Sequence, residues 1–227
     1  MNPLSPSLRA DTLRHIDEVL VRCPALADLS SEIIRTVEAI CACHRAGGKI
    51  LICGNGGSAA DGEHIVGEMV KGFLLPRPIP TADADRLRAA DLTGSHDNLA
   101  EKLQRGVAAI ALTGHPALAT AIGNDTGGEM VFAQQVYVYG RPGDILIGLS
   151  TSGNSINVLR ALTVARAFGL VTVGLTGSLP CRMDRLCDLC LKVPAQGTHQ
   201  IQELHLPVYH TVCLMVEQEL FGEPPSA

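Results

Sequence analysis

The sequence predicts an α/β protein with a doubly wound parallel sheet of five strands between layers of helices. Two observations predict it. Five short runs of nearly continuous apolar residues occur, most of them followed directly by Gly, Ser or Thr, as in strands buried on both faces. Helical patterns alternate with these runs, which is the order of βαβ units. In such sheets ligands bind where the strands end, so the loops after the strands are the candidate functional loops.

The elements follow from the spacing of apolar residues. Two helical patterns open the chain at 8–21 and 31–46, and Gly47-Gly48 ends the second. The predicted strands are 49–53, 108–112, 144–149, 171–175 and 189–193. Helices are predicted at 58–72, 129–139, 155–168 and 200–220.

The segment 75–106 does not fit this alternation. It begins with the Pro-rich LLPRPIP, continues with the polar pieces DADRLRAADL and SHDNLAEKLQ, and is long for a connection. A helical lid, an oligomer arm and an exposed insertion between the first two strands all fit it.

Composition narrows the function. Aromatic residues make up 3% with no Trp, and the net charge is -5, which argues against nucleic-acid binding. We find no run of roughly 18 apolar residues and no signal-peptide order at the N-terminus, so we expect a cytoplasmic protein without membrane contact. Its eight cysteines are then expected to be reduced.

The cysteines do not predict a metal site. Cys187 and Cys190 form one CxxC with Cys181 nearby, whereas Cys41 and Cys43 lie far away in the chain. A structural zinc site usually needs two suitably spaced pairs. We expect the cysteines to act as small hydrophobic residues.

The first candidate loop is CGNGGSAADGEH, which follows the strand 49–53. Glycines let a backbone approach a ligand closely, and the N-terminus of the next helix favours an anion. Gly54, Gly56 and Ala59 loosely fit the dinucleotide pattern. That reading also needs an acidic residue after the second strand, where the chain has Thr113-Gly114-His115 instead. Dinucleotide binding is therefore disfavoured.

The second candidate loop follows the strand 144–149 and reads STSGNS. Four hydroxyl residues and one glycine precede the helix 155–168, and hydroxyls and helix N-termini both donate to phosphate oxygens. The alternative is an N-cap turn, which needs only one hydroxyl. We expect a phosphate cradle, and the missing GxxxxGK[ST] excludes a nucleotide P-loop.

Two pairs of polar residues suggest a metal site. His64 and Glu68 are four residues apart on one predicted helix, and Gln202 and His210 are eight apart on the last one. Two nitrogen and two oxygen donors suit Zn²⁺ or a similar divalent ion, but a surface ion pair and a core histidine fit the spacing too. Pro207 is expected to kink the last helix.

Together these motifs, with Asn124-Asp125 and the C-terminal IQE and His210, resemble the SIS (sugar isomerase) domain proteins, and among them the bacterial phosphoheptose isomerases. The resemblance covers 31–75 and 108–221. It implies one SIS domain over 1–227, with N-terminal helices in 1–46 and an insertion at 75–106. It also implies a homotetramer with active sites between subunits.

The resemblance implies roles for individual residues. Glu68 and His210 correspond to the acid/base pair, and one Zn²⁺ (or another divalent ion) per active site is held by His64, Glu68, Gln202 and His210. The sugar phosphate is bound by Asn55, Gly56, Gly57, Ser58, Asn124, Asp125, Ser150, Thr151, Ser152, Ser155 and Gln202.

The resemblance implies the isomerisation of sedoheptulose 7-phosphate to D-glycero-D-manno-heptose 7-phosphate. The residue types named above suit such an aldose–ketose isomerisation. A proton moves between C1 and C2 through an enediol(ate), so a carboxylate and an imidazole can share the work. A divalent ion would polarise the carbonyl.

Three features depart from the family: the long 75–106 segment, His199 in place of an acidic residue, and Pro207 within the last helix. The main rival is a non-catalytic SIS protein, of the kind that binds the bacterial replication initiator. That group typically lacks the final histidine, so His210 favours the enzyme. A different phosphosugar isomerase or an aldolase-like use of the metal site also stays open.

Overall fold

The computed structural model describes residues 8–92, 94 and 99–223, and its centre is a five-stranded parallel sheet. The strands are β1 (Ile50–Cys53), β2 (Ala109–Ala111), β3 (Ile145–Leu149), β4 (Val171–Gly177) and β5 (Leu189–Val193). Their order is β2-β1-β3-β4-β5, and all four pairings are parallel. The predicted fold class is confirmed.

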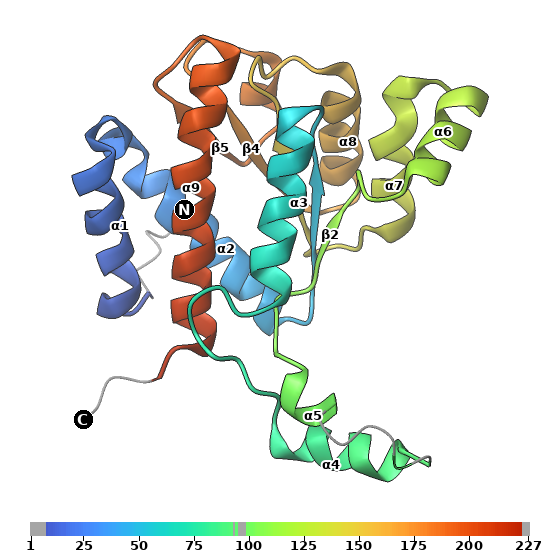
Figure 1. Ribbon diagram of the computed structural model, residues 1–227. Coiled ribbons are helices and arrows are strands. Elements are labelled where there is room, and N and C mark those ends of the chain that lie inside the picture. The colour runs from blue at the N-terminus through green and yellow to red at the C-terminus, as the bar shows by residue number, and fades with distance from the viewer. Residues whose placement is uncertain (1–7, 93, 95–98, 224–227) are drawn as a thin grey trace.

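Helices cover both faces of this sheet (Figure 1). One face carries α1 (Ala10–Arg22), α2 (Ser30–Arg45), α3 (Gly57–Val70) and α9 (Thr198–Phe221), and the other carries α7 (Val131–Tyr139) and α8 (Ile156–Ala167). The remaining helices are α4 (Thr81–Ala90), α5 (Leu99–Lys102), α6 (Pro116–Asp125) and the 3-10 turns η1 (Pro24–Leu29), η2 (Gly128–Met130) and η3 (Arg182–Arg185).

The central strands β1 and β3 are buried on both sides, because successive side chains point to opposite faces and helices cover each face. Ile50 and Ile52 pack with α2, α3 and α9, whereas Leu51 and Cys53 pack with α7 and α8. All four residues of β1 are buried, which explains why the strand is continuously apolar in the sequence.

The sheet order places the two candidate loops next to each other. The chain leaves β1 on one side towards β2 and returns on the other side to β3, so the order reverses between β1 and β3. The loops that follow these two strands therefore meet at the topological switch point, where doubly wound domains bind ligands.

The segment 75–106 contains α4 and α5 and projects from the body of the protein (Figure 1). Its two ends are joined by an antiparallel bridge between Pro78 and Gln104, and Arg105 donates its backbone N–H to the Arg77 carbonyl. Residues 93 and 95–98 of this segment, like 1–7 of the predicted N-terminal region, lie outside the described residues.

Pro207 does not end the last helix, and the kink expected there stays a prediction. α9 runs as one helix from Thr198 to Phe221 with Pro207 inside it. Proline removes one backbone donor, but helix packing compensates: Val208, Val212 and Val216 are buried against the core.

Candidate functional site

The loop Ser150–Ser155 joins β3 to α8 and has the form of a binding loop rather than a simple cap. Ser155 is the N-cap residue of α8 but makes no side-chain cap hydrogen bond. Its Oγ lies 2.9 Å from Ser150 Oγ instead. Gly153 has a φ of 63°, the left-handed region that glycine favours, and Ser152 Oγ accepts from the Asn154 N–H at 3.2 Å.

Hydrogen bonds from β4 and η3 hold the backbone of this loop in place. The Thr151 carbonyl accepts from the Gly177 N–H at 3.2 Å and from Thr176 Oγ1 at 3.3 Å. Met183 N–H donates to the Gly153 carbonyl at 3.2 Å. The ends of β4 and the turn η3 therefore fix the loop backbone, while Ser152 remains exposed.

The glycine loop after β1 lies beside it. Asn55 and Asn157, at the start of α8, exchange two amide hydrogen bonds of 2.9 and 2.8 Å that tie the two loops together. Gly56 has a φ of 55°, and a side chain at Gly57 would stand 2.4 Å from Gln202 Nε2. Gly57 thus gives room for Gln202 to lie against the loop. Ser58 is buried.

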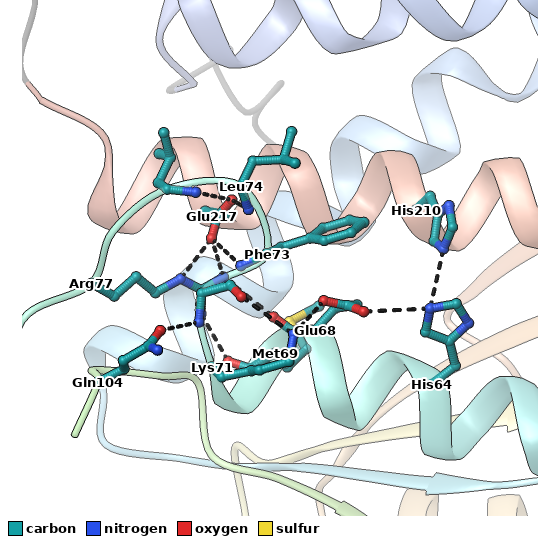
Figure 2. A network of polar contacts seen from close by, with 12 residues as sticks. His64, Glu68, Met69, Lys71, Phe73, Leu74, Arg77, Gln104, His210 and Glu217 are labelled. Atoms are coloured by element: carbon teal, nitrogen blue, oxygen red, sulfur yellow. Dashed lines mark hydrogen bonds and ion pairs between the residues drawn. The ribbon is translucent and has the colours of Figure 1, made fainter. Parts of the chain in front are cut away.

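A second group of polar side chains lies further along α3. His64 Nε2 is 3.4 Å from Glu68 Oε1 and 3.4 Å from His210 Nε2 on α9 (Figure 2). We call these three residues the histidine–glutamate cluster. Phe73 packs its ring edge-on against the His210 ring, with centroids 5.4 Å apart.

The surroundings of His210 lower the pKa of its imidazole. Burial lowers the pKa of His210 from its usual value, the nearby His64 lowers it further, and Glu68 partly opposes the shift. His210 is therefore neutral near pH 7, as a general base must be. Glu68 Oε2 is paired with Lys71 Nζ at 3.0 Å.

The cluster has the donor types of a zinc site. Zn–N and Zn–O bonds of about 2.0–2.1 Å at tetrahedral angles place two donors about 3.3 Å apart, close to both 3.4 Å separations. Within the described part of the chain, however, no three His, Cys, Asp or Glu side chains are arranged to hold a metal. The three side chains by themselves therefore do not form a complete metal site in this structure.

The other predicted residues lie apart from this cluster. Gln202 is eight residues before His210, about 12 Å along α9. Asn124 and Asp125 end α6, are exposed and hydrogen-bond each other at 2.9 Å. Within the described residues, no hydrogen bond or ion pair joins either of them to the cluster or to the two loops.

Three residues at these sites were not predicted. Asn157 follows the loop Ser150–Ser155, which we call the hydroxyl loop, and ties it to Asn55. The Tyr209 hydroxyl contacts His64 Nδ1, and Asp61 accepts from that hydroxyl. Asp61 precedes His64 by one helical turn, a spacing that would have pointed to it. No sequence motif singled out Tyr209, because only the packing of α3 on α9 brings its hydroxyl to His64.

All eight cysteines are free thiols. Burial raises the pKa of Cys41 to about 12, so its thiol stays protonated. Among the described helices, none is long and apolar enough to cross a membrane.

The sheet order and the loops at its switch point agree with one domain family. The family model for the SIS domain matches residues 14–85 and 85–177, and the chain belongs to this family. Phosphoheptose isomerase of Rhodospirillum rubrum is 40% identical over 196 residues, which cover 86% of this chain and 89% of that protein. Phosphoheptose isomerase 2 of Campylobacter jejuni is 42% identical over 180 residues, 79% of this chain and 76% of that protein.

The solved structures agree with these relatives. The phosphoheptose isomerase of Neisseria gonorrhoeae superimposes with a TM-score of 0.67 at 32% identity, covering 92% of this chain and 94% of that one. The similarity therefore extends over most of the chain.

Proposed function

We propose that this protein is a phosphosugar aldose–ketose isomerase that converts sedoheptulose 7-phosphate into D-glycero-D-manno-heptose 7-phosphate. The observation that carries the proposal is the histidine–glutamate cluster, in which His64 lies 3.4 Å from both Glu68 and His210. The relatives named phosphoheptose isomerase support the choice of substrate.

The residues divide the reaction between them. Glu68 takes the proton from one of the two carbons, C1 or C2, to give the enediol(ate), and His210 delivers a proton to the other carbon. The lowered pKa of His210 suits the opposite role, in which the neutral imidazole takes the carbon proton near pH 7. The roles exchange in the reverse direction.

The hydroxyl loop binds the phosphate in this proposal. Ser150, Thr151, Ser152 and Ser155 donate to the phosphate oxygens, and the N-terminus of α8 adds a favourable dipole. Asn55, Gly56, Gly57 and Ser58 line the sugar, and we retain Gln202, Asn124 and Asp125 as further sugar contacts.

We propose that His64, Glu68 and His210 hold one divalent ion, Zn²⁺ by donor type. Gln202 lies about 12 Å from His210 along α9, so it would be a further donor only from a neighbouring copy. When bound, the ion polarises the substrate carbonyl. Metal analysis of the purified protein tests this: one zinc per chain, lost in His64→Ala, is expected. Full activity after exhaustive chelation contradicts it.

We also propose a homotetramer with sites shared between subunits. Ser58 and Glu68 are ten residues apart on α3, about 15 Å along its axis, so the loops and the cluster are separated within one copy. A neighbouring copy that brings its cluster to the loops would complete the site.

We propose a cytoplasmic location, because the eight cysteines are free thiols, as proteins of a reducing compartment keep them. Fractionation of the cells that make the protein checks this. Recovery with periplasmic or membrane markers contradicts it.

A panel of ketose and aldose phosphates tests the function. NMR in D₂O is expected to show conversion of sedoheptulose 7-phosphate with exchange at C1 or C2. His210→Asn should lose turnover by 100-fold or more while the sugar phosphate still binds, because general acid–base catalysis contributes about 10²–10⁴-fold. Binding without exchange on any sugar of the panel would favour a non-catalytic SIS protein.

A further inference from the structure

A chain of hydrogen bonds reaches His64 from the side away from the cluster. Tyr209, on α9, is 3% exposed, and its hydroxyl lies 3.2 Å from Asp61 Oδ1 and 3.1 Å from His64 Nδ1. Asp61 and His64 are three residues apart on α3, so Tyr209 links two side chains of the same helix face. The rings of His64 and Tyr209 meet edge-on with centroids 5.5 Å apart.

The protons of this chain can be assigned from the chemistry of its groups. A tyrosine hydroxyl has one hydrogen to donate, and an ionised carboxylate only accepts. Tyr209 therefore donates to Asp61, and its oxygen accepts from the other neighbour, His64. The neutral imidazole of His64 must then carry its hydrogen on Nδ1, which leaves the lone pair on Nε2.

We propose that Tyr209, held by Asp61, is a positioning residue that fixes the tautomer and the orientation of His64. Nε2 then presents its lone pair to the space beside Glu68 and His210, each 3.4 Å away. A histidine that ligates a metal commonly donates its other ring N–H to a protein group that sets its tautomer. For its effect on turnover, the inference rests on the proposed isomerase function.

Packing and positioning by Tyr209 can be separated. The ring fills space between α3 and α9, whereas the hydroxyl alone orders the imidazole. Tyr209→Phe keeps the ring and removes the hydroxyl. Asp61→Ala instead removes the acceptor, so the Tyr209 hydroxyl is expected to donate to His64 Nδ1 and to move the imidazole hydrogen to Nε2.

The test is nitrogen NMR of the full chain labelled with ¹⁵N-histidine, at pH 8 without added metal, where imidazoles are neutral. His64→Gln identifies the His64 signals. We expect the Nδ1–H tautomer in the parent, a mixture in Tyr209→Phe and mainly Nε2–H in Asp61→Ala. An Nε2–H tautomer in the parent, or the parental tautomer in both variants, overturns the proposal.

Metal affinity provides a second measurement. Titration with Zn²⁺ should show about 10–100-fold weaker binding in Tyr209→Phe, the usual effect of losing such a partner. Tyr137→Phe is the matched control, because Tyr137 is 59% exposed on α7, and it should bind Zn²⁺ as the parent does. Equal affinity in the parent and Tyr209→Phe contradicts the proposal.

Kinetics separates this inference from the proposed function. If the enzyme isomerises the sugar, Tyr209→Phe should lower kcat with little change in KM, because Tyr209 does not contact the sugar in the proposed site. If no sugar of the panel reacts, the proposed function fails, but the tautomer of His64 still decides the positioning role. Circular dichroism confirms that each variant is folded.

Discussion

At the scale of single residues, two of the hydroxyls after β3, those of Ser150 and Ser155, pair with each other rather than cap the helix that follows. Ser155 does not cap α8, and Ser150, which is 4% exposed, pairs with it at 2.9 Å. A serine at an N-cap normally satisfies a backbone N–H of the first turn. The N-cap turn weighed as the alternative is therefore not what these side chains form, which agrees with the proposed phosphate cradle.

Ser150→Ala should weaken the binding of a sugar phosphate by about 10–100-fold, because a hydrogen bond to a charged group contributes about 1.5–3 kcal/mol. Calorimetry with the substrate, or with inorganic phosphate, measures the loss. Ser30→Ala is the control, since Ser30 bonds only the Ala27 carbonyl on the surface and is remote from the loop. Unchanged affinity in Ser150→Ala would remove this residue from the proposed phosphate site.

His205 is the other residue whose surroundings the sequence did not reveal. It is fully buried on α9, and neither ring nitrogen makes a well-formed hydrogen bond among the described residues, although the Thr176 backbone lies nearby. Burial lowers the pKa of His205 to about 4, and Thr176 opposes this only partly. The imidazole is therefore neutral in the folded protein over most of the pH range.

This shift predicts a pH dependence of stability. Unfolded His205 takes up a proton below about pH 6.5 and folded His205 only near pH 4, so the free energy of unfolding falls as the pH drops through this window. The loss attributable to His205 between pH 7.5 and pH 5 is about 2 kcal/mol, at 1.36 kcal/mol per pKa unit.

Urea unfolding at several pH values measures the effect. His205→Gln should lose less stability than the parent between pH 7.5 and pH 5, whatever its stability at pH 7.5. His199→Gln, an exposed histidine on the same helix, should keep the parental pH dependence. A parental dependence in His205→Gln would show that this imidazole is not the cause.

At the scale of elements, a buried ion pair anchors the chain where it leaves α3. Glu217 on α9 accepts from the backbone N–H groups of Phe73 and Leu74, each at 2.7 Å, and pairs with Arg77 at 2.7 Å. Both charged side chains are 1% exposed. Arg77 also donates to the carbonyls of Met69 and Glu68, so this anchor holds the end of the helix that carries Glu68 (Figure 2).

Glu217→Gln should destabilise the protein by about 3–5 kcal/mol at pH 7, because it leaves the Arg77 charge buried and unpaired. Burial alone would raise the pKa of Glu217, but the backbone N–H groups and Arg77 lower it below its usual value. Its stabilisation is thus present above about pH 4.5 and is lost as the pH falls through the folded pKa.

Urea denaturation checks both points. The difference between parent and Glu217→Gln should shrink as the pH falls from about 4.5, the ordinary pKa of a glutamate, through the lowered pKa of the folded parental carboxyl. Glu203→Gln serves as the control: Glu203 is exposed on α9, and its substitution should change stability by less than about 0.5 kcal/mol. An equally small effect of Glu217→Gln would mean that Arg77 finds another partner.

At the scale of the whole molecule, three exposed apolar side chains lie on the elements that carry the cluster or adjoin them. Val70 is 48% exposed, Leu74 is 70% exposed and Leu206 is 41% exposed, on α3, on the loop after it and on α9. Another copy of the chain that covers them would bury this apolar area, in line with the proposed homotetramer.

We therefore expect the protein to sediment as an oligomer, with four copies according to the proposal. Leu206→Glu should dissociate this oligomer, because it places a charge in the proposed contact between copies. Analytical ultracentrifugation measures both. Phe168→Glu, on the opposite face after α8, is the control, since Phe168 is equally exposed at 50%. A monomeric parent would contradict the shared active site.

Elements that bury much apolar surface were predicted from the sequence, and elements that bury little were missed. The five strands were predicted to within two residues, because each reads as a short apolar run, although only β1 and β3 are fully buried and the edge strands β2 and β5 are partly exposed. The helices α4 and α6 were missed because they bury almost nothing: Ala84 is the one buried residue of α4, and Ile122 of α6. Without a buried stripe, a helix has no periodic signal.

The sequence alone determined the doubly wound sheet, the two loops at its switch point and the placement of His64 and Glu68 on one helix face, since these follow from local patterns and topology. Only the tertiary structure decided which distant residues meet. The packing of α3 on α9 brings His210 to His64 and Tyr209 to Asp61, and it carries Gln202 to Gly57. Such contacts depend on the relative rotation of two helices, which side-chain packing sets and which the spacing within either helix does not contain.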